Sequence, residues 1–284
     1  MKIKHFFDQE TATFTYVVSD EDALKCAIID SVLNYNMSAG RILSHSADEV
    51  VAYISDNNLT VDWILETHAH ADHITASHYL KEKLGGQIAI GERINEVIKF
   101  WGPIFNADNC PKLDSFKFDK LLKNNEVINI GSLEVKVMNT PGHTPACVCY
   151  LIEDNVFVGD TIFMPDVGTA RTDFPGGSAQ DLFDSIQNIF ALPLKTNLYT
   201  AHDYPTEDRI ICCKSTVGQQ RTNNMMIGGD ITKEQFIHAR KAKDKLSDIP
   251  NLLLPAIQIN IQAGNLPVAE ENNVCYIKIP VNQL

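Results

Sequence analysis

The feature that most restricts the fold of this chain is a cluster of four potential metal ligands within six residues. His68, His70, Asp72 and His73 follow directly on residues 61–65, a short apolar run with the pattern of a buried strand. Imidazole nitrogens and carboxylate oxygens are ligands that Zn, Fe and similar ions prefer, and a cation between them relieves the repulsion of crowded donors. The alternative is a chance string in which Asp72 only caps the helix that follows. We favour a metal site at the end of a strand.

Other potential ligands occur at the ends of further predicted strands. His143 follows a strand and a Pro-Gly turn, Asp160 follows Val-Gly at the end of a second strand, and His202 lies just after a third. Strands hold such side chains in fixed positions, while the loops that follow leave access for a small molecule. We therefore expect these residues to join the histidine cluster in one site.

Alternating and helical spacings of apolar residues predict a strand-rich middle with helices around it. Strands are expected at residues 13–18, 26–30, 61–65, 127–130, 133–138, 147–152, 156–158 and 198–201. Helices are expected at residues 46–57, 74–84, 178–190 and 233–246. The first helix opens with a capping-box pattern from Ser46 to Glu49, and Gly85 and Gly86 close the second. The residues after the last helix are interpreted as an extended tail interrupted by prolines.

The charge and hydropathy of the chain exclude some function classes. The formal net charge is −12, whereas nucleic-acid-binding proteins use clustered Lys and Arg to displace counterions. One short basic segment, at residues 240–245, is interpreted as a solvated helix face. No window approaches the ~20 apolar residues needed to span a bilayer, and the N-terminus lacks the apolar run of a signal peptide. We therefore expect a cytoplasmic protein with neither a nucleic acid nor a membrane as its partner.

Seven cysteines, at positions 26, 110, 147, 149, 212, 213 and 275, include no CxxC pair. An odd number without such a pair suits reduced intracellular thiols better than a disulfide framework. We expect each to be a small buried residue, including the adjacent Cys212 and Cys213.

Four motifs resemble the metallo-β-lactamase superfamily in order and spacing. They are residues 67–73 (THAHADH), 141–145 (PGHTP), 159–160 (GD) and 201–204 (AHDY). The resemblance implies an α/β fold of the αββα sandwich type, with two mainly antiparallel sheets, helices on the outer faces and a metal at one edge. The region from about residue 215 is more polar and contains one predicted helix, so we expect residues 1–214 to form this catalytic domain and residues 215–284 to form a C-terminal arm packed on it.

Within that superfamily the chain resembles the persulfide dioxygenases. The similar strings are residues 13–16 (TFTY), 29–30 (ID), 73–76 (HITA), 171–174 (RTDF) and 202–204 (HDY). Residues 164–166 (MPD), 173–177 (DFPGG) and 255–260 (PAIQIN) also resemble the bacterial β-lactamase hydrolase-like proteins of sulfide detoxification. The chain carries no rhodanese-like domain, and we expect a sulfurtransferase of that kind to be a separate partner.

The resemblance implies one Fe(II) per chain, held by His68, His143 and Asp160. Two histidines and one carboxylate leave three coordination positions open, so that O₂ and a persulfide sulfur can bind the same ion. The implied reaction oxidises glutathione persulfide, or a related low-molecular-weight persulfide, to sulfite and releases the thiol. Four neighbours would orient the ligands and hold water: His70, Asp72, His73 and His202.

Two further residues are expected at the substrate. The guanidinium of Arg171 would pair with a substrate carboxylate, the alternative being a structural ion pair with Asp173 or another carboxylate. Tyr204 would hydrogen-bond near the iron, the alternative being a packing role. The expected partners are therefore a thiol persulfide and O₂. Because members of this fold commonly pair, we also expect a homo-oligomer.

Two rival functions use the same residues. A dinuclear zinc hydrolase that resembles glyoxalase II would cleave a glutathione thioester with a metal-bound hydroxide, since the cation lowers the pKa of bound water toward ~7. Its two Zn(II) ions would need all seven ligands: His68, His70, Asp72, His73, His143, Asp160 and His202. A non-catalytic thiol or metal sensor on the same scaffold is less favoured, because it would lack several ligands or carry a DNA-binding segment. The strings that flank the ligands favour iron.

Overall fold

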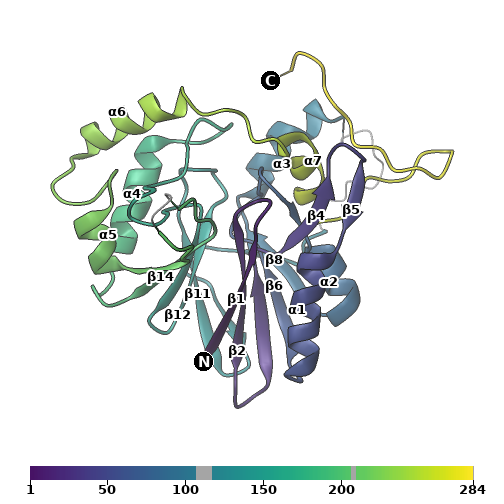
Figure 1. The fold of residues 1–284 in the computed structure, drawn as a ribbon, viewed down its shortest axis with the longest axis horizontal. Helices are drawn as coiled ribbons and strands as arrows, with labels where there is room; N and C mark the ends of the chain where they lie inside the picture. Colours follow the sequence, from purple (N-terminus) through teal and green to yellow (C-terminus); the bar gives the residue numbers. More distant parts are fainter. Residues whose placement is uncertain (107–116, 206–208, 284) are drawn as a thin grey trace.

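The computed structural model describes residues 1–106, 117–205 and 209–283 and has two six-stranded sheets packed face to face with helices on both outer faces (Figure 1). One apolar cluster lies between the sheets and contains Tyr16 and Tyr150. A second lies under the helices on the first sheet, and a third under those on the second sheet. This is the αββα sandwich predicted from the four sequence motifs.

The first sheet is mixed rather than mainly antiparallel. Its strands are, in order, β1 (Lys2–Asp8), β2 (Thr13–Asp20), β3 (Lys25–Ile29), β6 (Thr60–Leu65), β8 (Gln87–Gly91) and β9 (Lys120–Leu122). β1, β2 and β3 are antiparallel, whereas β3, β6, β8 and β9 run parallel. Parallel neighbours need a long connection. Helices α1 (His45–Asp56), α2 (Ser77–Leu84) and α3 (Ile94–Ile104) lie within these connections.

The second sheet is antiparallel except for one pair. Its strands are, in order, β10 (Val127–Ile130), β11 (Leu133–Asn139), β12 (Val148–Ile152), β13 (Asn155–Gly159), β14 (Asn197–Thr200) and β15 (Lys214–Thr216). β13 and β14 are parallel and are connected through helix α4 (Ala179–Phe190). A small third sheet has the order β5 (Arg41–Leu43), β4 (Val32–Asn36) and β7 (Ile74–Thr75).

Residues beyond 214 add three helices, which contact both halves of the sandwich. Helices α5 (Val217–Asn223) and α6 (Lys233–Asp244) pack against α4, whereas α7 (Leu253–Asn260) packs against β7. The segment therefore passes from the α4 side of the molecule to the side that carries α1, α2 and α3 (Figure 1).

Local predictions from sequence fail in three places. Ser46 does not open a capping box, because helix α1 begins at His45 and the Ser46 hydroxyl donates to Asp8 Oδ1 at 2.9 Å. The helix expected from residue 74 begins at Ser77, since Ile74 and Thr75 pair with β4 as strand β7. Helix α7 replaces part of the expected extended tail. Its Pro255 lies in the first turn, where backbone N–H groups have no partner within the helix, so the missing N–H of proline costs nothing there.

The cysteine and membrane expectations can be compared with the described residues. Cys110 lies outside them, and the other six cysteines form no disulfide. Cys26, Cys147, Cys149 and Cys213 are buried as predicted. Cys212 is half-buried and Cys275 is exposed, so the expectation of burial is wrong for these two. No helix in the described part of the chain is long and apolar enough to cross a membrane.

Candidate metal centre

Three side chains from both sheets converge at one edge of the sandwich. His68 follows β6 of the first sheet, His143 follows β11 of the second sheet, and Asp160 follows β13. The Nε2 atoms of His68 and His143 each lie 3.7 Å from Asp160 Oδ2. The three potential ligand atoms are all within 4.8 Å of one another, and all three residues are buried. This spacing allows one ion to contact all three.

The rings of both histidines are held by their second nitrogen. His143 Nδ1 donates to the carbonyl of Arg171 at 2.8 Å. His68 Nδ1 lies 3.0 Å from Thr67 Oγ1, which itself donates to Asp30 Oδ2 at 2.8 Å and therefore accepts from His68. A proton on Nδ1 leaves a lone pair on Nε2, and such hydrogen bonds fix the orientation of a metal-binding imidazole. Both Nε2 lone pairs therefore face Asp160.

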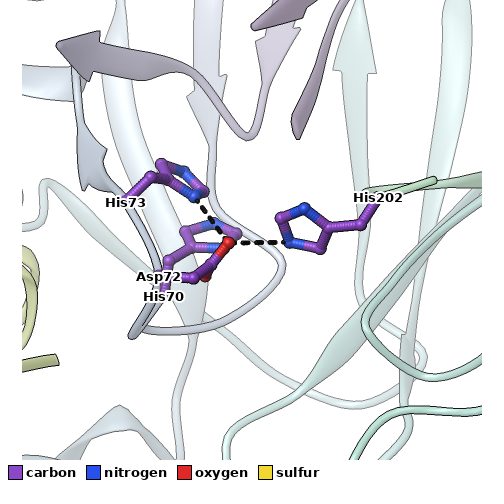
Figure 2. A group of neighbouring side chains, drawn as sticks. All are labelled: His70, Asp72, His73 and His202. Atoms are coloured by element: carbon purple, nitrogen blue, oxygen red, sulfur yellow. Dashed lines mark ion pairs between the residues drawn. The ribbon is translucent and has the colours of Figure 1, made fainter. Parts of the chain in front are cut away.

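A second group of potential ligands adjoins the first. His70, Asp72, His73 and His202 bring one ligand atom each within 4.8 Å of one another. Figure 2 shows His73 and His202 on opposite sides of the Asp72 carboxylate, with Nδ1 of His73 3.5 Å and Nε2 of His202 3.2 Å from Asp72 Oδ2. Nε2 of His202 also lies 3.3 Å from Asp160 Oδ1, which connects the two groups.

Unsatisfied polar atoms test whether a metal fits this site. Six of the eight buried side-chain atoms without a hydrogen bond in the described residues belong to these two groups: His68 Nε2, His70 Nδ1, Asp72 Oδ2, His73 Nε2, Asp160 Oδ1 and His202 Nε2. A buried polar atom without a partner costs about 1–3 kcal/mol. Nitrogen and oxygen donors with free lone pairs suit iron and zinc. The residues therefore form a metal-binding site.

His70 is held between two buried carboxylates that the sequence reading did not assign to the site. Its Nε2 lies 3.1 Å from Asp30 Oδ1 and 3.1 Å from Glu66 Oε2, and Glu66 also accepts hydrogen bonds from the hydroxyls of Thr75 and Ser77. Burial opposes protonation of His70, but the two carboxylates raise its pKa well above the usual value. The sequence did contain a signal for these two residues, since Asp30 and Glu66 each directly follow an apolar strand.

Burial and neighbouring charges also shift the pKa of the other ligands. Burial, followed by the nearby His70 and His143, lowers the pKa of His68 well below its usual range, which keeps the ring neutral. Burial acts against ionisation of Asp72, yet His202 and His73 lower its pKa well below the usual value. His68 in the first group is therefore a neutral imidazole and Asp72 in the second group a charged carboxylate, the forms that bind cations.

Two glycines allow the ligand loops to approach so closely. Gly159 has φ +51°, and a Cβ there would collide with the Thr67 side chain, which would displace the neighbouring Asp160. Gly142 has φ +148°, and a Cβ there would collide with the backbone of Leu182 in α4. Positive φ costs an ordinary residue energy that glycine avoids. These turns therefore depend on glycine for conformation and for space.

Helix α7 fixes the backbone of the histidine cluster. The buried Asn260 donates from Nδ2 to the carbonyls of His70 and His73, at 2.8 and 2.7 Å. Its Oδ1 accepts from the Thr75 N–H at 2.9 Å. Both the Nδ2 group and the Oδ1 atom of Asn260 are hydrogen-bonded to the backbone of this loop. Asn260 therefore holds the loop against α7 and is called the clasp below. Sequence reasoning included this residue only in a family-like string and gave it no role.

A pocket of about 240 Å³ opens beside the ligands and is lined by Asp72, His143 and Asp160 together with the two expected substrate residues. Arg171 makes hydrogen bonds of 2.6 and 2.7 Å with Asp173 and donates to the Asp248 carbonyl. These contacts match the structural ion pair that was the alternative to a substrate contact. Tyr204 is half-exposed, and its ring stacks on His202 at a centroid distance of 5.9 Å.

The basic segment of α6 forms one wall of this pocket. Arg240 is only 2% exposed and pairs with Asp244 at 2.7 Å, so the interpretation of the whole segment as a solvated face is wrong. Lys243 also lines the pocket, and its Nζ donates to the Val167 carbonyl at 3.3 Å. It forms no ion pair with a carboxylate in the part of the chain that the structure describes. Lys243 is therefore a cation still available to a substrate.

Known proteins share this scaffold over most of its length. The chain is 49% identical to "Glyoxylase B2" of Dictyostelium discoideum over all of this chain and 98% of that protein. It is 44% identical to a "Beta-lactamase hydrolase-like protein" of Xylella fastidiosa over all of this chain, which spans 65% of that relative. It is 27% identical to "Persulfide dioxygenase ETHE1, mitochondrial" of Bos taurus over 92% of this chain and 88% of that protein.

A solved structure and a family profile also match this chain. The crystal structure of ETHE1 from Myxococcus xanthus superimposes with a TM-score of 0.75 at 27% identity and covers 93% of this chain and 100% of that one. The sequence profile of the metallo-beta-lactamase superfamily matches residues 9–202, which include every potential ligand described above. The chain therefore belongs to the metallo-beta-lactamase superfamily.

Proposed function

We propose that this protein is an iron-dependent persulfide dioxygenase that acts on glutathione persulfide or a similar small thiol persulfide. The observation that carries the proposal is the separation of the potential ligands into two groups. His68, His143 and Asp160 form a two-histidine, one-carboxylate group of their own, while His202, whose Nε2 lies 3.3 Å from Asp160 Oδ1, belongs to the second group. The similarity to a named persulfide dioxygenase supports the same reaction.

The proposed reaction combines a persulfide, O₂ and water to give a thiol, sulfite and two protons. The bond between the two sulfur atoms breaks, and these atoms together transfer four electrons to O₂. Fe(II), bound as one ion per chain, would supply open coordination positions where O₂ and the sulfur can meet. The residues of the chain would hold the ion, orient the substrate and limit the entry of water.

The chain's own residues provide these functions through fixed contacts. Thr67 and the Arg171 carbonyl hold the Nδ1 atoms of His68 and His143, so both Nε2 atoms keep one direction. Burial, followed by Asp72 and Asp160, raises the pKa of Tyr204, so its phenol stays protonated and can donate a hydrogen bond to the substrate. Lys243 would pair with a carboxylate of the thiol carrier, in place of the Arg171 contact expected from sequence.

We propose that residues 1–214 form the catalytic domain and that residues 215–284 form an arm that completes its site. Lys243 and Asn260 both lie in this arm and contact the pocket or the ligand loop. A separate rhodanese-like sulfurtransferase would supply or consume persulfide, and a homo-oligomer in the cytoplasm remains our expectation.

A two-zinc thioester hydrolase is the second candidate function. It is favoured by the second ligand group, in which the Nε2 atoms of His73 and His202 have no hydrogen bond. A relative named as a glyoxylase, at 49% identity, points in the same direction. Two bound cations would occupy both groups, whereas one iron would leave the second group to hydrogen-bond water.

Metal content and oxygen consumption distinguish the two candidates. Protein purified without oxygen should contain about one iron per chain and should consume O₂ when glutathione persulfide is added. His143→Ala should abolish the uptake, while His78→Ala, on the exposed side of α2, should leave it unchanged. Two zinc ions per chain, cleavage of a glutathione thioester and no O₂ uptake would replace the dioxygenase by the hydrolase.

A further inference from the structure

A second, much smaller cavity lies beside His143, between helices α3 and α7. Its volume is about 20 Å³, and its walls include Val97 and Trp101 of α3 and Leu253 and Ile257 of α7. About 10–15 Å³ on this measure suffices for one water molecule. The cavity therefore admits a molecule of one or two heavy atoms and excludes any part of a thiol substrate larger than that.

Two of the side-chain polar atoms at the cavity wall, Thr144 Oγ1 and His143 Nδ1, are already hydrogen-bonded. Thr144 Oγ1 lies 3.1 Å from Cys147 Sγ and accepts from the Ala146 N–H at 3.2 Å. His143 Nδ1 donates to the Arg171 carbonyl. A buried water needs two to four polar partners, and cavities without them stay dry and take up apolar atoms. The lining therefore favours a small apolar molecule over water.

The small cavity meets the larger pocket close to the ligands. Ala71, His143 and Phe174 line both spaces, and the Phe174 ring lies edge-to-face with His143 at 5.4 Å. The larger pocket carries Lys243 and two carboxylates, whereas no charged side chain lines the small cavity. A larger pocket with charged side chains in its wall and a small cavity without them therefore both reach His143.

We propose that the cavity between α3 and α7 binds dioxygen and delivers it to the ligand cluster beside His143. This inference rests on the proposed function, because a hydrolase has no gaseous substrate. An oxygenase has to admit one charged and one apolar reactant. The larger pocket, with Lys243 in its wall, suits the charged persulfide, and a dry cavity of this volume suits O₂. A separate binding place also allows O₂ to lie beside the cluster while the persulfide fills the larger pocket.

Dioxygen binding can be measured without catalysis. O₂ is paramagnetic and speeds the relaxation of methyl protons in contact with it. In the full chain loaded with diamagnetic Zn(II) under O₂ pressure, methyl groups of Val97, Leu253 and Ile257 should relax faster than those of Ile186, which is also buried, in the core under α4. Equal relaxation at the two places would overturn the proposal, whichever metal the enzyme uses.

A variant that fills the cavity tests delivery. Val97→Leu adds one methylene to the wall, and the KM for O₂ should rise by roughly tenfold, as for one misplaced methylene in an apolar pocket. The KM for glutathione persulfide and the iron content should stay unchanged. Val50→Leu makes the same change in the buried face of α1, away from the cavity, and should leave both KM values unchanged.

The results separate this inference from the proposed function. Oxygen uptake by the unmodified enzyme with no change of the O₂ KM in Val97→Leu would refute delivery and leave the dioxygenase intact. Absence of O₂ uptake by the unmodified enzyme would refute the dioxygenase, and the relaxation experiment would then still decide whether the cavity binds O₂.

Discussion

Asn260→Ala should weaken both the fold and the metal site, because this side chain joins α7 to the ligand loop. The change removes three hydrogen bonds, two donated to the carbonyls of His70 and His73 and one accepted from Thr75. Each such bond contributes about 1 kcal/mol net, and a buried partner left unsatisfied costs up to about 3 kcal/mol. We expect a loss of roughly 3 to 5 kcal/mol in the free energy of unfolding.

Metal affinity should fall together with stability. The two carbonyls belong to the segment that carries four potential ligands, so their release lets the loop take other conformations. Loss of a group that orients metal ligands typically weakens binding by about 10- to 100-fold. Denaturant unfolding of the metal-free protein would measure the first effect, and anaerobic titration with Fe(II) or Zn(II) would measure the second.

A matched variant separates the clasp from a general effect of losing an asparagine. Asn265→Ala removes one amide in the same arm that donates only to the Gln262 carbonyl, at 2.8 Å. It should lower stability by about 1 kcal/mol and leave metal affinity unchanged. The reasoning would be refuted if Asn260→Ala bound metal as tightly as the unmodified protein, or if both variants lost stability equally.

Three further changes test other parts of the structure. Thr67→Val breaks the link from His68 to Asp30 and should weaken metal binding by about 10- to 100-fold in the same titration, with little change in molecular shape. Lys243→Met should raise the KM for glutathione persulfide roughly fivefold, as for a half-exposed ion pair of about 1 kcal/mol, whereas Lys245→Met should not. For Asp20, hydrogen bonds from the hydroxyl and N–H of Ser132 lower the pKa from 3.8 to about 2. Since the folded pKa lies below the unfolded one, this carboxylate stabilises the fold above about pH 4, and the contribution is lost as the pH falls toward 2. Urea unfolding should therefore show Asp20→Asn to be less stable than the unmodified protein at neutral pH, with a difference that shrinks toward pH 2.

The convergence of His68, His143 and Asp160 could be anticipated from local pattern, while their role as metal ligands stays a prediction. His68, His143 and Asp160 each follow a short apolar strand or a glycine turn, and strand ends in a sandwich of this type meet at one edge. The fold followed from the order of these motifs. The helix boundaries near Ser46 and Ile74 could not be predicted in this way, since pairing with β1 and β4 overrides the local signals at both places.

The missed residues act across long sequence separations. Asn260 reaches a loop 187 residues earlier, and Lys243 reaches Val167 across 76 residues. No local pattern shows that Asn260, in an apolar helix, hydrogen-bonds a distant loop, or that Lys243, in a basic segment, lines a pocket. Arg240 illustrates the same difficulty, because only the folded structure brings the Thr169 carbonyl to its guanidinium, although Asp244 is one turn along the same helix.

The arm also explains why superfamily membership leaves the reaction open. All seven potential ligands lie within residues 9–202, the part matched by the superfamily profile, so metal binding belongs to the shared scaffold. Lys243 on the pocket wall, Leu253 and Ile257 on the cavity wall, and Asn260 on the ligand loop all lie beyond it. Two relatives could keep every ligand and still differ in these contacts, since function on a common fold depends on the residues grafted around the site. The choice between a persulfide with O₂ and a thioester with water therefore depends on residues outside the matched region as much as on the metal.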